Sequence, residues 1–196
     1  MDRFDVTAQD FNKYFGVCKM TYTRHYNSPL GGILLAADET GLTGLWFEWQ
    51  KYFPHDLQAA RTEAETPILA EAARWLDVYF RGEEPDFLPP LHPIGSPFRQ
   101  EVWNILLRIP YGKTVTYGDI ARQLAKKRGL ETLSAQAVGG AVGHNAVSIL
   151  IPCHRVVGTN GSLTGYAGGM DRKIKLLTLE RADMSRLFIP KMGTAL

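Results

Sequence analysis

The sequence predicts an α/β (α+β) protein in which a small antiparallel sheet with one helix precedes a mainly helical C-terminal part. Three observations support this fold class. Runs of β-like composition separated by turn residues occupy residues 18–49, a proline-rich stretch follows at 84–93, and helical periodicity dominates from residue 96 onward. A chain of 196 residues with 45% hydrophobic side chains can bury one large core or two small ones.

The predicted sheet comes from three short runs that turn-forming residues separate. These runs are residues 18–26, 33–37 and 42–49. An amphipathic helix should follow from Thr66-Pro67 to Gly82, because proline suits the first helical position and apolar side chains recur at helical spacing. This helix is expected to pack on the sheet.

Residues 84–93 contain four prolines, which exclude a regular helix or a central strand and indicate a linker. We therefore expect four segments: an N-terminal extension at residues 1–16, an α/β domain at 17–92, a second domain at 93–182 and a C-terminal tail at 183–196.

Four helices are predicted in the second domain. The first spans 96–109, the second starts at Thr116 and should be broken by the basic segment 126–129, the third spans 133–143, and the last spans 171–181. The second and third helices form a candidate helix-turn-helix in a winged-helix-like domain.

Charge is distributed unevenly along the chain. Residues 1–98 carry a net charge of −6, whereas residues 99–181 carry +7. A basic half suggests a polyanionic partner, although an ordinary solvated face stays open as an alternative.

Neither a membrane span nor an export signal is evident, because no run approaches roughly 18 apolar residues and the N-terminus is acidic. We therefore expect a cytoplasmic protein with no membrane partner. The two cysteines, Cys18 and Cys153, lie far apart, which predicts free thiols rather than a disulfide framework. The five histidines show no metal-binding spacing, so no metal site is predicted.

The third helix is made of unusually small residues, from Ser134 to Gly143. Such a segment has poor intrinsic helix propensity, but it lets the backbone approach another surface closely. That surface could be the minor groove of DNA or another helix of the same protein.

Cys153 lies in an apolar run directly before His154 and Arg155. A cysteine in such a run is, by itself, typical of a structural residue. A neighbouring base and a positive charge favour the thiolate, however, and His154 and Arg155 are side chains of these types. Glu180 is one of two acidic residues in the closing segment and could orient the imidazole.

Several segments together resemble the 6-O-alkylguanine-DNA alkyltransferases, also called methylated-DNA-protein-cysteine methyltransferases. The matching pieces are residues 111–117, 137–141, Asn145, 151–157 with Ile-Pro-Cys-His-Arg-Val-Val, 161–169 and 175–180. Pro-Cys-His-Arg followed by Tyr-x-Gly-Gly and a glutamate at these spacings is specific, and the resemblance covers about residues 18–181.

The resemblance implies DNA repair by direct, stoichiometric transfer of an alkyl group from 6-O-alkylguanine, with 4-O-alkylthymine as a further candidate substrate. Cys153 would accept the group once, and His154 would take its proton through a bound water. Glu180 would hold His154, and Asn145 would brace the turn before the cysteine. Because a thiolate and a proton suffice for displacement at carbon, no cofactor is expected.

The partner implied is double-stranded DNA, which a monomer would approach from the minor groove with the damaged base flipped out. Tyr166, with the backbone around Val156 and Ala167, would hold the flipped guanine, and Tyr117 would press on the neighbouring phosphate. The remaining candidate DNA contacts are Ala135, Gln136, Ala137, Gly139, Arg155, Lys126, Lys127 and Arg128.

Three departures from the family pattern stand out. Gln136 replaces an arginine that intercalates in many members, Ala146 replaces a proline, and the segment between Tyr117 and Gln136 is longer than in compact members. Two other functions stay open: a protein that binds alkylated DNA without repairing it, and a thiol hydrolase. Cys153, His154 and Glu180 argue against the first, and the basic half argues against the second.

Overall fold

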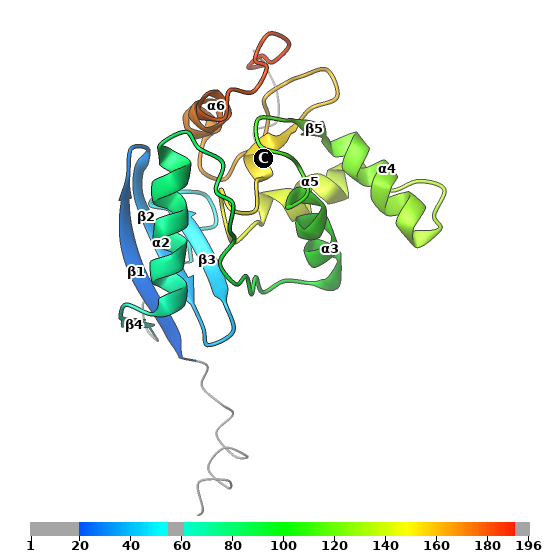
Figure 1. Cartoon of the computed structure of the whole chain (residues 1–196). Coiled ribbons are helices and arrows are strands. Elements are labelled where there is room, and N and C mark those ends of the chain that lie inside the picture. Colours follow the sequence, from blue (N-terminus) through cyan, green and yellow to red (C-terminus); the bar gives the residue numbers. More distant parts are fainter. Residues whose placement is uncertain (1–19, 55–60, 191–196) are drawn as a thin grey trace, which may run out of the picture.

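A computed structural model describes residues 20–54 and 61–190 (Figure 1). Its N-terminal part is a mixed four-stranded sheet with the order β3-β2-β1-β4. The strands are β1 (Thr21–Ser28), β2 (Gly31–Ala37), β3 (Leu42–Phe47) and β4 (Arg61–Glu63). The three expected strands form the antiparallel part, whereas β4 pairs in parallel with β1 and was not predicted.

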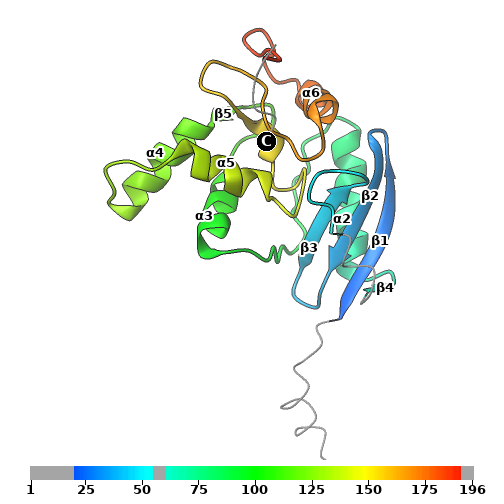
Figure 2. The same cartoon turned by 180° about the vertical axis from the view of Figure 1, so that it is seen from behind.

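Helix α2 (Pro67–Phe80) crosses one face of the sheet (Figures 1 and 2). Thr66 begins it, because its side chain accepts a hydrogen bond from the Leu69 N–H and Pro67 follows at the first helical position. Leu69, Leu76 and Tyr79 are completely buried on the face that meets the sheet. The predicted helix and its packing are therefore confirmed.

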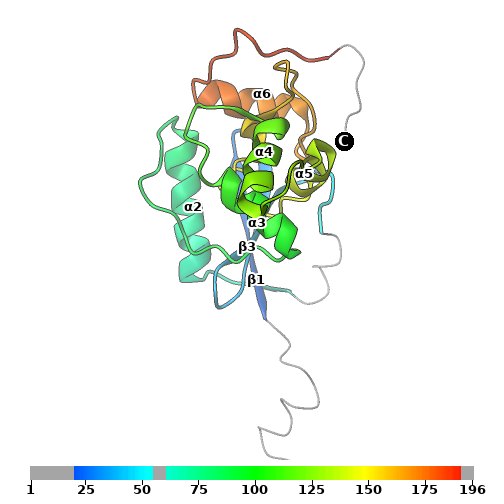
Figure 3. The ribbon, with the colours of Figure 1, turned by 90° about the vertical axis from the view of Figure 1, so that its right-hand side faces the viewer.

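The helical part contains α3 (Pro97–Leu106), α4 (Tyr117–Arg128), α5 (Ala135–Gly143) and α6 (Met170–Leu179). Figure 3 shows α3, α4 and α5 in front of the sheet and α6 at the top. Two short strands, β5 (Val115–Thr116) and β6 (Val156–Val157), pair in parallel beside them. Serine or threonine side chains cap the N-termini of α3, α4 and α5.

The second helix ends within the predicted segment 126–129, but at its glycine and not at its basic residues. Helix α4 continues through Lys126, Lys127 and Arg128 and ends at Gly129, whose φ of 64° is left-handed. Three cations in the last turn interact favourably with the negative end of the helix dipole, and glycine adopts the terminating conformation without strain.

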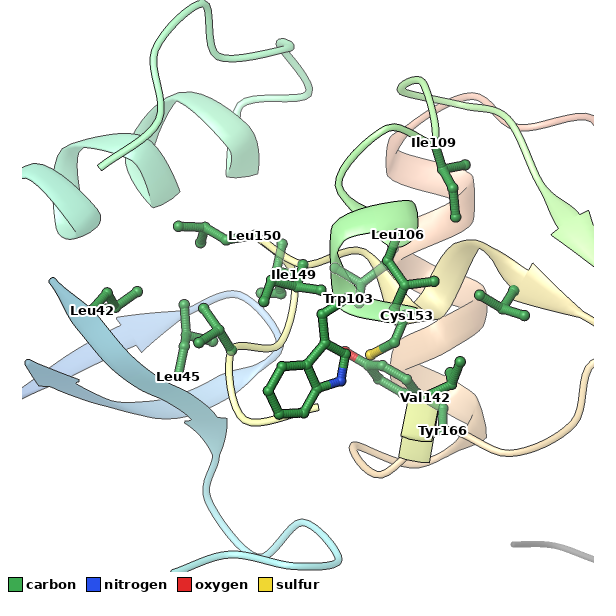
Figure 4. Close-up of a cluster of buried hydrophobic side chains, with 14 of the residues drawn as sticks. Leu42, Leu45, Trp103, Leu106, Ile109, Val142, Ile149, Leu150, Cys153 and Tyr166 are labelled. Carbon is green, nitrogen blue, oxygen red and sulfur yellow. The ribbon is translucent and has the colours of Figure 1, made fainter. Parts of the chain in front are cut away.

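The edge strand β3 joins the two parts of the molecule. Its Leu42 N–H donates to Pro90 O at 2.7 Å, and its Leu45 N–H donates to Ala146 O at 2.8 Å. One apolar core continues across this junction, from Leu42 and Leu45 of β3 to Trp103 of α3 (Figure 4). The sheet and the helical part are therefore packed against each other as one body.

In the described part of the chain, no helix is long and apolar enough to cross a membrane.

Candidate active site around Cys153

Cys153 begins the 3-10 turn η2 (Cys153–Arg155), which lies between the buried segment that ends at Pro152 and strand β6. Its side chain is only 4% exposed. The Cys153 N–H donates to Ile151 O at 2.8 Å, and the Arg155 N–H donates to Pro152 O at 3.0 Å. These local bonds fix the turn that carries the sulfur, which Figure 4 shows among the side chains of Leu106, Val142 and Tyr166.

Asn145 braces this turn from the end of α5. Its Nδ2 donates to Ile151 O at 2.8 Å and to Cys153 Sγ at 3.1 Å, and its Oδ1 accepts the Val147 N–H at 3.0 Å. Asn145 is 4% exposed, so these bonds do not compete with bulk water. One amide thus links the helix end, the backbone before the cysteine and the sulfur itself.

His154 and Glu180 form a completely protein-enclosed pair. His154 Nε2 lies 2.7 Å from Glu180 Oε1, and both side chains are 0% exposed. A carboxylate only accepts hydrogen bonds, so Nε2 carries the proton and Nδ1 offers its lone pair. No hydrogen-bond partner for His154 Nδ1 exists among the described residues.

Arg155 completes the charge balance of this pair. Its Nε donates to Glu180 Oε2 at 2.8 Å, its Nη2 donates to Oε1 at 3.0 Å, and its Nη1 donates to Ile109 O. The expectation that Arg155 contacts DNA does not fit this geometry, because its guanidinium is engaged inside the protein and the residue is 8% exposed.

A tyrosine from the sheet domain reaches the same carboxylate. Tyr79 of α2 is completely buried, and its hydroxyl donates to Glu180 Oε1 at 2.7 Å. The same hydroxyl lies 3.5 Å from His154 Nε2. Sequence reasoning missed Tyr79, because its position on the apolar face of α2 indicates only a core aromatic residue.

The ionisation of these groups follows from burial and from their partners. Burial raises the pKa of the Cys153 thiol, although the Asn145 hydrogen bond and the charge of Lys173 oppose this rise. Burial lowers the pKa of His154 despite the nearby Glu180 carboxylate. Burial alone would raise the pKa of Glu180, but the hydrogen bonds and charges of His154 and Arg155 outweigh it and lower the pKa to about 2.

Lys173 of α6 is a buried cation that the sequence analysis did not single out. It is 0% exposed, and its Nζ donates to Val156 O at 2.6 Å and to Thr164 O at 2.7 Å. Burial lowers the pKa of Lys173 to about 8, while the nearby Cys153 opposes this shift. The available signal was its spacing, since Lys173 shares a helix face with the buried Leu176 and Leu177.

A pocket opens between α5 and the segment around Tyr166. Its lining combines three glycines of α5 with residues of both parts of the molecule: Lys51, Tyr52, Tyr117, Gly139, Gly140, Gly143, His144, Gly165, Tyr166 and Ala167. The Tyr52 ring stacks on His144 with 4.4 Å between centroids, and the Lys51 N–H donates to Ala167 O at 3.0 Å. Lys51 and Tyr52 follow a strand in a turn-like segment, and no sequence pattern marked them.

Tyr166 contributes a further buried polar group to this region. Its hydroxyl and that of Ser148 are buried, and neither makes a well-formed hydrogen bond within the described residues, although Ser148 lies close enough to oppose the rise of the Tyr166 pKa. In Figure 4 the Tyr166 side chain points toward the Cys153 sulfur. Burial raises the pKa of Tyr166 well above its usual value, so its hydroxyl remains a hydrogen-bond donor.

The candidate DNA contacts occupy three different environments. Ala135, Gln136 and Ala137 are exposed at the start of α5, and a Cβ added at Gly140 would meet no atom within 4 Å. Tyr117 is engaged, since its hydroxyl donates to Thr164 O at 3.3 Å and to Gly165 O at 3.4 Å. Its pKa is raised by burial to about 12.

At the far end of α4, Lys126 and Lys127 are exposed. Arg128 differs, because its Nε lies 3.2 Å from Glu101 Oε2 and its guanidinium covers the Phe98 ring. Lys126 and Lys127 therefore face solvent, whereas Arg128 is paired within the protein.

Within residues 20–54 and 61–190, no three His, Cys, Asp or Glu side chains gather in a way that could hold a metal ion. Cys18 and His55 lie outside the described residues.

Two family models match the chain. Residues 21–93 match the ribonuclease-like domain of 6-O-methylguanine DNA methyltransferase, and residues 97–182 match the DNA-binding domain of the same family.

Individual relatives agree. A methylated-DNA--protein-cysteine methyltransferase of Mycobacterium leprae is 41% identical over 83% of this chain and 93% of its own length. The constitutive methylated-DNA--protein-cysteine methyltransferase of Bacillus subtilis is 40% identical over 83% of this chain and 96% of its own length.

Solved structures are also similar. The Mycobacterium tuberculosis protein in complex with DNA is 41% identical, with a TM-score of 0.72 over 85% of this chain and 94% of that one. The crystal structure of the Mycobacterium tuberculosis O6-methylguanine methyltransferase gives 40% identity and a TM-score of 0.70, over 88% of this chain and 97% of that one. With both halves of the sequence matched, this chain belongs to the 6-O-methylguanine DNA methyltransferase family.

Proposed function

We propose that this protein is a methylated-DNA–protein-cysteine methyltransferase that repairs 6-O-alkylguanine in double-stranded DNA by moving the alkyl group irreversibly to Cys153. One observation carries the assignment of the acceptor: Asn145 holds the Cys153 sulfur at 3.1 Å directly beside the buried His154–Glu180 pair. A nucleophilic thiol requires a reducing compartment, which fits a cytoplasmic protein.

In the proposed reaction, the Cys153 proton passes through a bound water to the free Nδ1 of His154. Glu180 stabilises the imidazolium that forms, because its carboxylate stays ionised and contacts Nε2 at 2.7 Å. The thiolate then attacks the alkyl carbon: a sulfur–carbon bond forms, the carbon–oxygen bond breaks, and its electron pair goes to the guanine oxygen. The proton that His154 took from Cys153 then passes through water to the released guanine, so the imidazole returns to its neutral form and the proton count balances.

The flipped base occupies the pocket beside α5. The Tyr166 hydroxyl donates to its edge, and the backbone at Ala167, which lines the pocket, contacts its other polar atoms. The carbonyl of Val156 lies outside this lining and already accepts from Lys173, so it would contact the base only through its second lone pair. Extrusion costs a few kcal/mol and less for a badly paired lesion, which contributes selectivity.

DNA lies across the small-residue face of α5, with its minor groove toward Gly140 and with Gln136 in the space that the base vacates. Tyr117 presses on the phosphate beside the lesion, and Lys126 and Lys127 contact phosphates further along. The protein acts as a monomer. It uses no cofactor, because the thiol supplies the only acceptor that the transfer needs.

Intact-protein mass spectrometry tests this proposal after incubation with a duplex that contains one 6-O-methylguanine. The expected result is a methyl group on the peptide that contains Cys153, at one equivalent, and no gain for Cys153→Ser. A parallel duplex with 4-O-methylthymine tests the second substrate. Tight binding to the damaged duplex without any mass gain would instead indicate a non-repairing binder.

A further inference from the structure

Tyr79 belongs to α2, on the sheet side of the molecule, yet its hydroxyl lies in the buried polar cluster behind Cys153. Its ring is held by stacking on Trp75, with 5.2 Å between centroids, and by edge contacts with Phe80 and Tyr111. The hydroxyl is therefore placed on Glu180 by the packing of one domain against the other.

The two oxygens of Glu180 accept hydrogen bonds from different groups. Oε2 accepts from Arg155 Nε at 2.8 Å and from the Gly112 N–H at 3.1 Å. Oε1 accepts from Tyr79, from His154 and from Arg155 Nη2, at 2.7, 2.7 and 3.0 Å. Tyr79 and His154 thus donate to the same oxygen, and each bond to Oε1 weakens the negative charge available to the other.

We propose that Tyr79 is a positioning residue of the transfer site: by donating to Glu180 Oε1 it limits how strongly the carboxylate holds His154, and so sets the basicity of His154 toward the Cys153 proton. This inference rests on the proposed function, in which His154 accepts that proton. It also gives the N-terminal domain a direct part in the chemistry.

The direction of the effect follows from electrostatics. A carboxylate with one donor fewer stabilises the imidazolium more, which raises the pKa of His154. A His154 that is already protonated cannot accept the thiol proton. Removing the Tyr79 hydroxyl should therefore move the acidic limb of the rate–pH profile to higher pH.

The other charged or titratable groups facing the pair do not mimic this change. Arg155 of η2 stays charged throughout. Lys173 of α6, with a pKa lowered by burial to about 8, titrates on the basic side. Tyr111, Tyr79 and Tyr166 have pKa values raised by burial above their usual range and stay neutral.

The test compares single-turnover transfer rates of wild type, Tyr79→Phe and the matched control Tyr111→Phe across roughly pH 5 to 9. Tyr111 touches the same ring cluster, but its hydroxyl reaches only Leu179 O, at 3.5 Å. For Tyr79→Phe we expect the acidic limb to move up by roughly half a unit to one unit, because His154 feels only part of the roughly one to two units that a hydrogen bond to a charged group is worth. The plateau rate and the affinity for DNA should stay within about twofold of wild type, as for Tyr111→Phe.

A second variant allows the same measurement if Tyr79→Phe does not fold. Replacing Tyr79 with 2,3-difluorotyrosine keeps the ring and strengthens the donor, so the acidic limb should move to lower pH. An unmoved limb in this variant, or a Tyr79→Phe rate reduced by the same factor at every pH, overturns the inference and leaves the proposed function intact. If the rate–pH profile of wild type has no acidic limb, or if His154→Gln keeps that limb, His154 does not accept the thiol proton. The inference then fails together with the proposed role of His154.

Discussion

The two sides of Cys153 are built in opposite ways. Behind the sulfur, the polar atoms of Glu180 and Arg155 are paired with groups of the protein itself, and only His154 Nδ1 is left over. In front of it, the Tyr166 hydroxyl makes no well-formed hydrogen bond within the described residues, and glycines line the pocket. Apart from His154 Nδ1, which the proposed mechanism supplies with a water, the rear makes its hydrogen bonds within the protein, whereas the front leaves hydrogen bonds to be made by a ligand.

Substitutions on the two sides of Cys153 should therefore affect stability and transfer differently. A change at the rear breaks bonds that exist in the folded protein, so it should reduce stability, and it should affect transfer only as far as it alters His154. A change at the front removes groups whose bonds form only with DNA, so it should reduce transfer while leaving the fold unaffected.

Glu180→Gln should have the largest effect. It leaves the buried Arg155 without its counterion, which costs about 3–5 kcal/mol of unfolding free energy, and it removes the partner that stabilises His154. We expect urea denaturation to show this loss and single-turnover assays to show almost no transfer. Glu101→Gln, which removes an exposed pair with Arg128, is the matched control and should change neither quantity much.

The same variant tests a pH dependence. The pKa of Glu180 is lowered to about 2 in the folded protein, so its contribution to stability is present above the usual value of 4.5 and disappears as the pH falls toward 2. This contribution is about 3 kcal/mol from the size of the shift. The stability of wild type should fall by that much more than the stability of Glu180→Gln over this interval, and parallel curves would contradict the buried pair.

Tyr166→Phe should separate the front from the rear. Because the Tyr166 hydroxyl makes no well-formed hydrogen bond within the described residues, its loss should change the unfolding free energy little, while transfer slows roughly tenfold to a hundredfold. Tyr79→Phe, which loses a bond that already exists, should destabilise the protein by about 1–3 kcal/mol. Equal destabilisation of the two variants would refute the distinction.

Gly140→Leu tests the small-residue face of α5. The space around this position is open, so the fold should tolerate the side chain, but a close approach of DNA should not. We expect an affinity about tenfold lower or weaker in duplex-binding titrations. Gly140→Ala should keep most binding and gain up to about 1 kcal/mol of stability from helix propensity. Unchanged binding by Gly140→Leu would place DNA elsewhere.

The smallest effects should come from the end of α4. Lys126→Gln and Lys127→Gln should each lower the slope of log affinity against log salt by about 1, without affecting transfer at saturating DNA. Arg128→Gln should leave this slope unchanged, because its guanidinium is already paired with Glu101. A slope change for Arg128→Gln alone would mean that this ion pair opens on binding.

Local signals in the sequence predicted most of the fold. The sequence indicated helix starts at Thr66, Ser96 and Thr116, and the structure confirms that all three residues cap helices. The parallel strand β4 escaped notice, because three residues of unremarkable composition become a strand only through pairing with β1. The predicted domain boundary stays a prediction.

At the candidate site, sequence reasoning brought together Cys153, His154 and Glu180 through their motif. It assigned Arg155 to DNA, whereas that side chain turns inward, and it missed Tyr79 and Lys173. These errors share a cause. The direction of a side chain and its partner depend on packing between segments far apart in the chain, which spacing along the sequence does not encode.

Strand β3 has a further consequence for the behaviour of the protein at high concentration. An unpaired strand edge is a template for aggregation, but the backbone of β3 is already bonded to Pro90 and Ala146 of the same chain. The opposite edge consists of β4, which is three residues long and carries Arg61 and Glu63, and of residues 24–28 of β1, which β4 does not cover and which are mostly polar. Neither edge of the sheet offers a neighbouring copy a long apolar strand, so the protein should resist edge-to-edge association when it is not bound to DNA.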